Sequence, residues 1–117
     1  MFSHEKLTVY QHSIRWLAIS AKLLRGFPAG NADHLANQLR RASLSIPLNI
    51  AEGAGKIGKL DKKRYYAIAR GSALECAAIL DAIIVLQLCD TENVSDGKKL
   101  LREIVAILSE VCIKKEV

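Results

Sequence analysis

Proline, glycine and aromatic residues are all scarce in this sequence of 117 residues. It holds 2 Pro, 7 Gly, 1 Trp, 3 Tyr and 2 Phe, whereas hydrophobic residues, mostly aliphatic, make up 50% of it. A β-sandwich needs a turn about every 8–12 residues, so this shortage of turn formers argues against an all-β fold. We expect long helices in a single domain covering residues 1–117, because a chain of this length buries roughly 65% of its unfolded surface around one core.

Cysteine is also rare and shows no pairing pattern. Cys76, Cys89 and Cys112 are an odd number, contain no Cys-x-x-Cys pair and lie in apolar stretches. This usage favours packing roles in a reducing compartment over disulfides, which places the protein in the cytoplasm. The first twenty residues mix charged side chains with apolar ones, so we expect no secretory leader.

Apolar residues recur at helical spacing in four segments, which predicts an all-α protein. The first helix should run from about Glu5 to Arg25 and end at Gly26-Phe27-Pro28. The core stripe predicted for it consists of Leu7, Tyr10, Ile14, Leu17, Ala21 and Leu24.

The second predicted helix contains a proline. It should begin at a cap formed by Asn31 or Asp33 and end near Gly53. Its stripe consists of Leu35, Leu39, Ala42, Ile46 and Ile50. Because Pro47 removes a backbone donor and presses on the carbonyl of Ser43, we expect a kink there. Alternatively the helix breaks at Ile46, since the residue before a proline avoids the α region.

The third predicted helix, from about Leu60 to Cys89, is apolar on nearly every side in its second half. Glu75, Asp81 and Gln87 are its polar residues between 73 and 89, and they argue against a transmembrane helix. One core face cannot bury so much apolar surface. Either this helix is central, or its outer face meets another subunit, and we favour an oligomer.

The last predicted helix begins at Thr91 or Ser95 and completes the fold. Its stripe consists of Leu101, Ile104, Val105, Leu108, Val111 and Cys112. Four amphipathic helices joined by short links predict an up-down four-helix bundle.

Positive charge is concentrated in one segment, residues 54–70, whose local charge of +5 equals the net charge of the chain. Its acidic residue is Asp61, and its basic residues are Lys56, Lys59, Lys62, Lys63, Arg64 and Arg70. Such a concentration indicates attraction to phosphate or to an acidic partner. A solvated loop and helix start would give the same pattern, and we leave both interpretations open.

Two sequence motifs for nucleotide binding match only in part. Gly53, Gly55 and Gly58 fit G-x-G-x-x-G, and Lys59 fits the lysine of a P-loop, but Leu60 stands where that loop needs Ser or Thr. Both motifs also require a preceding strand, whereas helical periodicity precedes these glycines. We therefore interpret residues 53–59 as a flexible basic loop between helices.

Motifs for metal binding and catalysis are lacking as well. His4, His12 and His34 have no Glu-x-x-His or His-x-x-x-His partner, and no arginine precedes any of them by five residues. No Ser, Cys and His arrangement stands at motif spacing. We expect no metal, no cofactor and no catalytic residue, so the chain is not predicted to be an enzyme.

Several polar residues interrupt otherwise apolar helices and are predicted to form a structural polar network. They are Arg40, Arg41, Asn49 and Glu52 on the second helix, and Ser72 and Glu75 on the third. A charge inside a bundle is costly unless it is paired. We predict that Arg40 or Arg41 pairs with Glu52 or Glu75 and fixes the register between helices or subunits, whereas solvation at the surface is the alternative.

Residues 38–53, QLRRASLSIPLNIAEG, resemble the signature of the bacterial four-helix-bundle proteins named after open reading frames in 23S ribosomal RNA intervening sequences. Phe27-Pro28 and residues 69–75 match as well, so the resemblance covers nearly the whole chain. It implies a ring-like homopentamer of bundles with no accepted catalytic residues and no established molecular function. The basic, glycine-rich stretch 55–59 departs from the family pattern.

Two functions follow from these features. The first is a non-catalytic protein associated with RNA or DNA through residues 56–70, whose weak phosphate contacts would multiply around a ring. Tyr65 and Tyr66 lie in that segment and could stack on bases. We expect at least one of them to pack in the core instead. The second is a scaffold or accessory subunit that docks a partner protein. By fold-level analogy, the related accessory proteins of diversity-generating retroelements form basic pentamers that bind a reverse transcriptase and nucleic acid.

Overall fold

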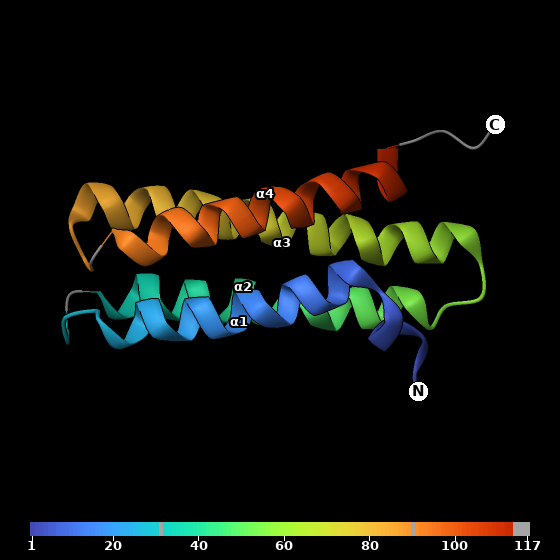
Figure 1. Cartoon of the computed structure of the whole chain (residues 1–117), viewed down its shortest axis with the longest axis horizontal. Coiled ribbons are helices and arrows are strands. Elements are labelled where there is room, and N and C mark those ends of the chain that lie inside the picture. The colour runs from blue at the N-terminus through green and yellow to red at the C-terminus, as the bar shows by residue number, and fades with distance from the viewer. Residues whose placement is uncertain (31, 90, 114–117) are drawn as a thin grey trace.

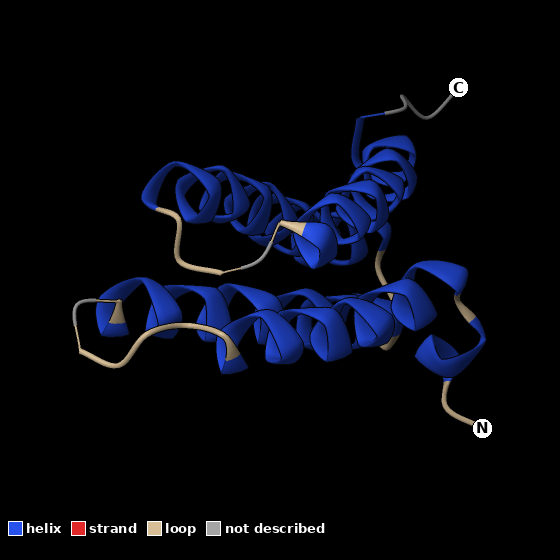
Figure 2. Cartoon of the chain, turned by 60° about the vertical axis from the view of Figure 1, so that its left-hand side comes forward, coloured by secondary structure: helices blue, strands red, loops and turns tan. Residues whose placement is uncertain are grey.

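Four long helices form an antiparallel bundle in the computed structural model, which describes residues 1–30, 32–89 and 91–113. The helices are α1 (Thr8–Arg25), α2 (Asp33–Ala54), α3 (Lys59–Leu86) and α4 (Glu92–Ile113), preceded by the short 3-10 helix η1 (Ser3–Lys6). Each helix contacts the next along the chain, and α4 returns to contact α1. Helices α1 and α2 form one layer, while α3 and α4 form the other (Figures 1 and 2). The predicted up-down four-helix bundle is confirmed.

The first helix begins later than predicted. Instead of starting near Glu5, the chain forms η1, passes through an extended Leu7 and only then enters α1 at Thr8. The backbone N–H of Phe2 donates to Glu5 Oε1 at 2.9 Å, and the N–H of Leu7 donates to the His4 carbonyl at 3.0 Å. These local bonds close a separate turn in front of the helix.

The predicted core stripe of α1 is wrong in its register. The buried residues are Val9, Ser13, Trp16, Ser20 and Leu23. Of the predicted stripe, Ile14 is 41% exposed and Ala21 is exposed, while the other members are half-buried. Ser13 and Ser20 are tolerated inside because each hydroxyl donates to the carbonyl three residues earlier, at 2.6 and 3.0 Å. The buried face of α1 therefore alternates large apolar side chains with small serines whose hydroxyls bond to the helix's own backbone.

Helix α2 continues through Pro47, so the alternative of a break at Ile46 is wrong, while the expected kink at Pro47 stays a prediction. Pro47 is itself buried, and the predicted stripe is confirmed, with Leu39, Ala42, Ile46 and Ile50 buried and Leu35 half-buried. The helix begins at Asp33, but its N-cap residue is Ala32, which makes no side-chain cap bond, so the predicted cap at Asp33 is wrong. Asn31, the other predicted cap, lies outside the described residues.

Helix α3 ends at Leu86, three residues before the predicted Cys89. Gln87 has a φ of 54°, in the left-handed region that commonly terminates helices, and the N–H groups of Gln87 and Leu88 close onto the carbonyls of Ile84 and Ile83. Within the described residues, no helix combines the length and apolar character needed to cross a membrane.

A fully buried contact joins three of the four helices. Trp16 Nε1 of α1 donates to Ser43 Oγ of α2 at 3.0 Å, and that oxygen lies 3.6 Å from Cys76 Sγ of α3. Burial raises the pKa of the Cys76 thiol from its ordinary 9.0 to about 11. On the fourth side, a Cβ on Gly97 of α4 would come within 2.9 Å of the Trp16 ring. Only glycine therefore fits against the indole without a shift.

Candidate nucleic-acid interface

The six predicted cations lie at one end of the bundle and along the first half of α3. Lys56 belongs to the loop 55–58 between α2 and α3, and the other five lie on α3. Figure 1 places this loop at the end of the molecule that also carries the N-terminus and the last turns of α4. The segment thus forms part of the outer surface of that end.

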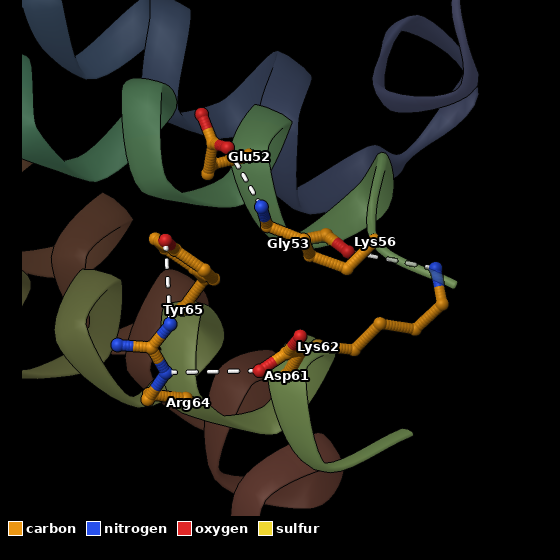
Figure 3. Close-up of polar contacts among 7 residues, drawn as sticks. All are labelled: Glu52, Gly53, Lys56, Asp61, Lys62, Arg64 and Tyr65. Carbon is orange, nitrogen blue, oxygen red and sulfur yellow. Dashed lines mark hydrogen bonds and ion pairs between the residues drawn. The ribbon is translucent and has the colours of Figure 1, made fainter. Parts of the chain in front are cut away.

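Lys62 completes the C-terminus of the preceding helix. Its ammonium donates to the carbonyl of Ala54 at 3.1 Å. It also donates to the carbonyl of Gly53 at 3.5 Å (Figure 3). The last carbonyls of a helix lack intrahelical donors and carry partial negative charge, so a cation there is stabilising. Lys62 therefore caps the end of α2, and we assign it a structural role at the α2–α3 corner.

Lys56 and Arg64 share one aromatic ring. The Lys56 ammonium lies 5.1 Å from the centre of the Tyr65 ring, and the Arg64 guanidinium carbon lies 4.7 Å from it. Each cation also has a carboxylate neighbour, with Lys56 Nζ 3.3 Å from Glu52 and Arg64 Nε 3.9 Å from Asp61 (Figure 3). Each acid stands three or four residues before its cation. Such spacing on a helix predicts these ion pairs, whereas the net charge of the segment does not.

The remaining cations are spread along α3. Arg70 is half-buried and donates through Nε to Ser109 Oγ at 2.7 Å, which ties α3 to α4 two turns beyond Lys62. Lys59 is exposed, Lys63 is half-buried, and both take part in contacts within the chain. The structure therefore brings Lys56, Lys62 and Arg64 to one corner and places Arg70 apart from them.

The predicted ion pairs of the structural polar network do not form within the chain. Glu52 pairs with Lys56, one turn away, rather than with an arginine about three turns away. Arg40 donates to the Asn37 side chain at 3.0 Å, and both Arg41 and Glu75 are exposed. Pairing between subunits stays a prediction.

The uncharged part of that network does connect α2 to α3. Ser72 Oγ donates to Ser45 Oγ at 2.7 Å, and Asn49 Nδ2 donates to the same hydroxyl at 3.0 Å and to the Ser45 carbonyl at 2.9 Å. These part-buried bonds satisfy polar groups between two helices without isolating a charge.

The glycine motif has no nucleotide-loop geometry. Gly53 lies in the last turn of α2, and a Cβ there would be 2.8 Å from Tyr66 Cε1 and 3.2 Å from Tyr65 Cβ. It permits close packing of α2 on α3 and cannot contribute to a phosphate-binding loop. Tyr66 packs against the core as expected, and burial, followed by the charge of Cys112, raises its pKa.

Acidic, histidine and cysteine side chains do not gather into a metal-binding group of three or more within the described part of the chain. His12 is the histidine with a carboxylate neighbour there. Its Nε2 lies 3.4 Å from Glu103 Oε2, and its Nδ1 lies 3.0 Å from Arg15. This chain of contacts links α1 to α4.

Comparison with known proteins agrees with this architecture. A crystal structure of a protein with unknown function from the S23 ribosomal protein family, from Bacteroides thetaiotaomicron, superposes with a TM-score of 0.80 at 19% sequence identity, over 92% of this chain and 100% of that one. At this identity the likeness shows the fold alone. No curated protein shows significant similarity to the chain. The model of the family described as 23S rRNA-intervening sequence protein matches residues 5–110, and the chain belongs to that family.

Proposed function

We propose that this protein is a non-catalytic, RNA-associated bundle that binds through residues 56–70. The observation that carries the proposal is the charge of residues 52–70, where six cations outnumber the carboxylates of Glu52 and Asp61 and a balance of +4 remains. Three of the four side chains in the two ion pairs are more than half exposed, and exposed pairs contribute at most about 1 kcal/mol. Phosphate groups can therefore attract Lys56 and Arg64 without a large structural cost.

Tyr65 supplies a second element that single-stranded RNA uses. Its ring is half-buried and lies beside two cations, so it can offer an edge or face to an unstacked base while the cations attract the adjoining phosphates. Base stacking on an aromatic ring contributes about 1–3 kcal/mol per base. The family's description, which refers to 23S rRNA intervening sequences, is consistent with an RNA partner.

A ring-like homo-oligomer, as in the pentamers implied by the family resemblance, is part of the proposal. Its support is the apolar surface that α3 leaves uncovered, with Leu74 44%, Val85 79% and Leu86 59% exposed. Repetition of the basic corner around a ring would multiply weak phosphate contacts into useful affinity.

The RNA proposal is tested by fluorescence anisotropy with a labelled single-stranded RNA, titrated between about 50 and 200 mM salt. Lys59→Gln with Arg64→Gln should weaken binding and lower the slope of log K against log salt by about 1.4, since each lost contact removes about 0.7. Lys22→Gln with Lys99→Gln removes the same charge from exposed positions elsewhere and should leave the slope nearly unchanged. Absence of salt-dependent binding by the unmodified protein contradicts the proposal.

A second candidate function is an accessory subunit that docks a partner protein. It is favoured by an open groove between α1 and α2 whose charged lining residues, among those that the structure describes, are both arginines. Affinity capture with nuclease treatment separates the two functions, because a protein partner survives nuclease whereas one bridged by RNA is lost.

A further inference from the structure

The groove between α1 and α2 has a volume of about 470 Å³. The two helices lie side by side in one layer of the bundle (Figures 1 and 2). The residues that line the groove are Leu17, Ser20, Ala21, Leu24 and Arg25 of α1, with Arg40 and Ser43 of α2.

The apolar part of this groove is the stripe that the sequence predicts for the core. Leu17 and Leu24 are half-buried and Ala21 is exposed, because the indole of Trp16 and its seam occupy the interior instead. Helix α1 thus carries a second apolar stripe that its own bundle covers only in part. The buried hydroxyls of Ser20 and Ser43 are already engaged, with the Leu17 carbonyl and with Trp16 Nε1. A ligand in this groove would therefore contact mainly its apolar side chains.

The charge at the rim has one sign. Arg25 lies on α1 and Arg40 on α2, and among the residues that the structure describes no acidic one lines the groove between them. Arg40 donates to the neutral amide of Asn37, and within the described residues neither arginine belongs to an ion pair. An occupant with carboxylates beside its apolar side chains would complement this rim.

We propose that the groove docks an acidic amphipathic helix of a partner protein. From Leu17 to Leu24 the stripe rises by about 10.5 Å, which equals the separation of apolar anchors at positions i and i+7 of a second helix. Asp or Glu side chains flanking those anchors reach Arg25 and Arg40. RNA would leave the apolar floor without contacts. The inference rests on the second candidate function and is independent of RNA binding at residues 56–70.

The test uses a labelled helical peptide, rich in alanine, with Leu at i, i+4 and i+7 and Glu beside them, and fluorescence anisotropy as the readout. A control peptide carries Lys in place of Glu. The Glu peptide should bind at least tenfold more tightly than the Lys peptide. Arg25→Gln with Arg40→Gln should reduce that affinity tenfold or more. Ala21→Phe, which fills the groove from an exposed position, should abolish binding.

Matched variants come from the groove between α3 and α4, which is lined by Ala106 and Arg102. Ala106→Phe, and Lys99→Gln with Arg102→Gln, should change the affinity less than twofold, with circular dichroism confirming that all variants fold. The proposal is overturned if the two peptides bind equally or if neither binds. It is also overturned if the matched variants lose as much affinity for the Glu peptide as the groove variants do. A loss of RNA affinity rather than peptide affinity in the arginine variant would also overturn it. If nuclease-resistant capture of a partner persists in Ala21→Phe, accessory docking stands and this groove is not its site.

Discussion

At the scale of single residues, the centre of the bundle depends on polar atoms that are buried and paired. Trp16, Ser13, Ser20 and Ser43 each have a hydrogen-bond partner, and among the described side chains no buried nitrogen or oxygen lacks one. Cys76 lies at the end of this arrangement, and its thiol is neutral because the surrounding apolar side chains cannot solvate a thiolate.

The Cys76 thiol predicts a specific loss of stability in alkali. Its folded pKa, about 11, exceeds its unfolded value of 9.0, so its contribution is fully present below pH 9 and is lost as pH rises toward 11. Between these values the free energy of unfolding should fall by about 1.4 kcal/mol per pH unit from this group. The Cys76→Ala variant serves as the reference, because it keeps every other ionisable group of the chain. Urea unfolding gives the free energy of unfolding of both proteins, and the difference between them should be smaller at pH 10 than at pH 8. A difference that stays constant contradicts a raised pKa at Cys76.

At the scale of helices, close approach between α2 and α3 depends on Gly53. A Cβ at this position would lie 2.8 Å from Tyr66 Cε1. Gly53→Ala should therefore destabilise the protein by about 1–3 kcal/mol through overpacking, despite the better helix propensity of alanine. Gly71→Ala is the matched control, since nothing lies within 4 Å of its Cβ position on α3, and it should raise stability by up to about 1 kcal/mol. Urea unfolding at one protein concentration measures the free energy of unfolding of both variants. An unchanged value for Gly53→Ala would contradict the packing argument.

The helices show which features a sequence pattern can predict. The stripe of α2 is apolar at every position, so its buried face is predicted correctly through Pro47. The stripe of α1 is predicted wrongly because the helix carries two apolar faces, and the buried one contains Ser13 and Ser20. A hydropathy pattern counts these serines as polar, whereas short-range bonds to the backbone make them suitable for the interior. The choice between the two faces depends on Trp16 and Gly97, which meet only in the folded bundle.

For the molecule as a whole, the sequence predicts where positive charge lies but not how it is engaged. Lys56, Lys62 and Arg64 do share a basic corner, yet Lys62 caps α2, and Arg70 lies apart and donates to Ser109 of α4. Those contacts depend on how α3 packs against α2 and α4 in the folded bundle, which composition cannot reveal. The pairing of Glu52 with Lys56, in contrast, follows i, i+4 spacing and was accessible from the sequence.

The uncovered face of α3 gives the last prediction, which concerns assembly. Val85 is 79% exposed on a helix whose neighbours α2 and α4 cover only its inner side, so Val85→Glu should leave the fold intact while placing a charge in an apolar contact between subunits. Sedimentation equilibrium should give the unmodified protein a multiple of the 12.9 kDa chain mass and the variant a smaller mass. Ile57→Glu, at a loop position that is 99% exposed, adds the same charge and should keep the larger mass. An unmodified protein with the mass of one chain would contradict the ring, since the apolar surface of α3 would then be stable in water without a partner.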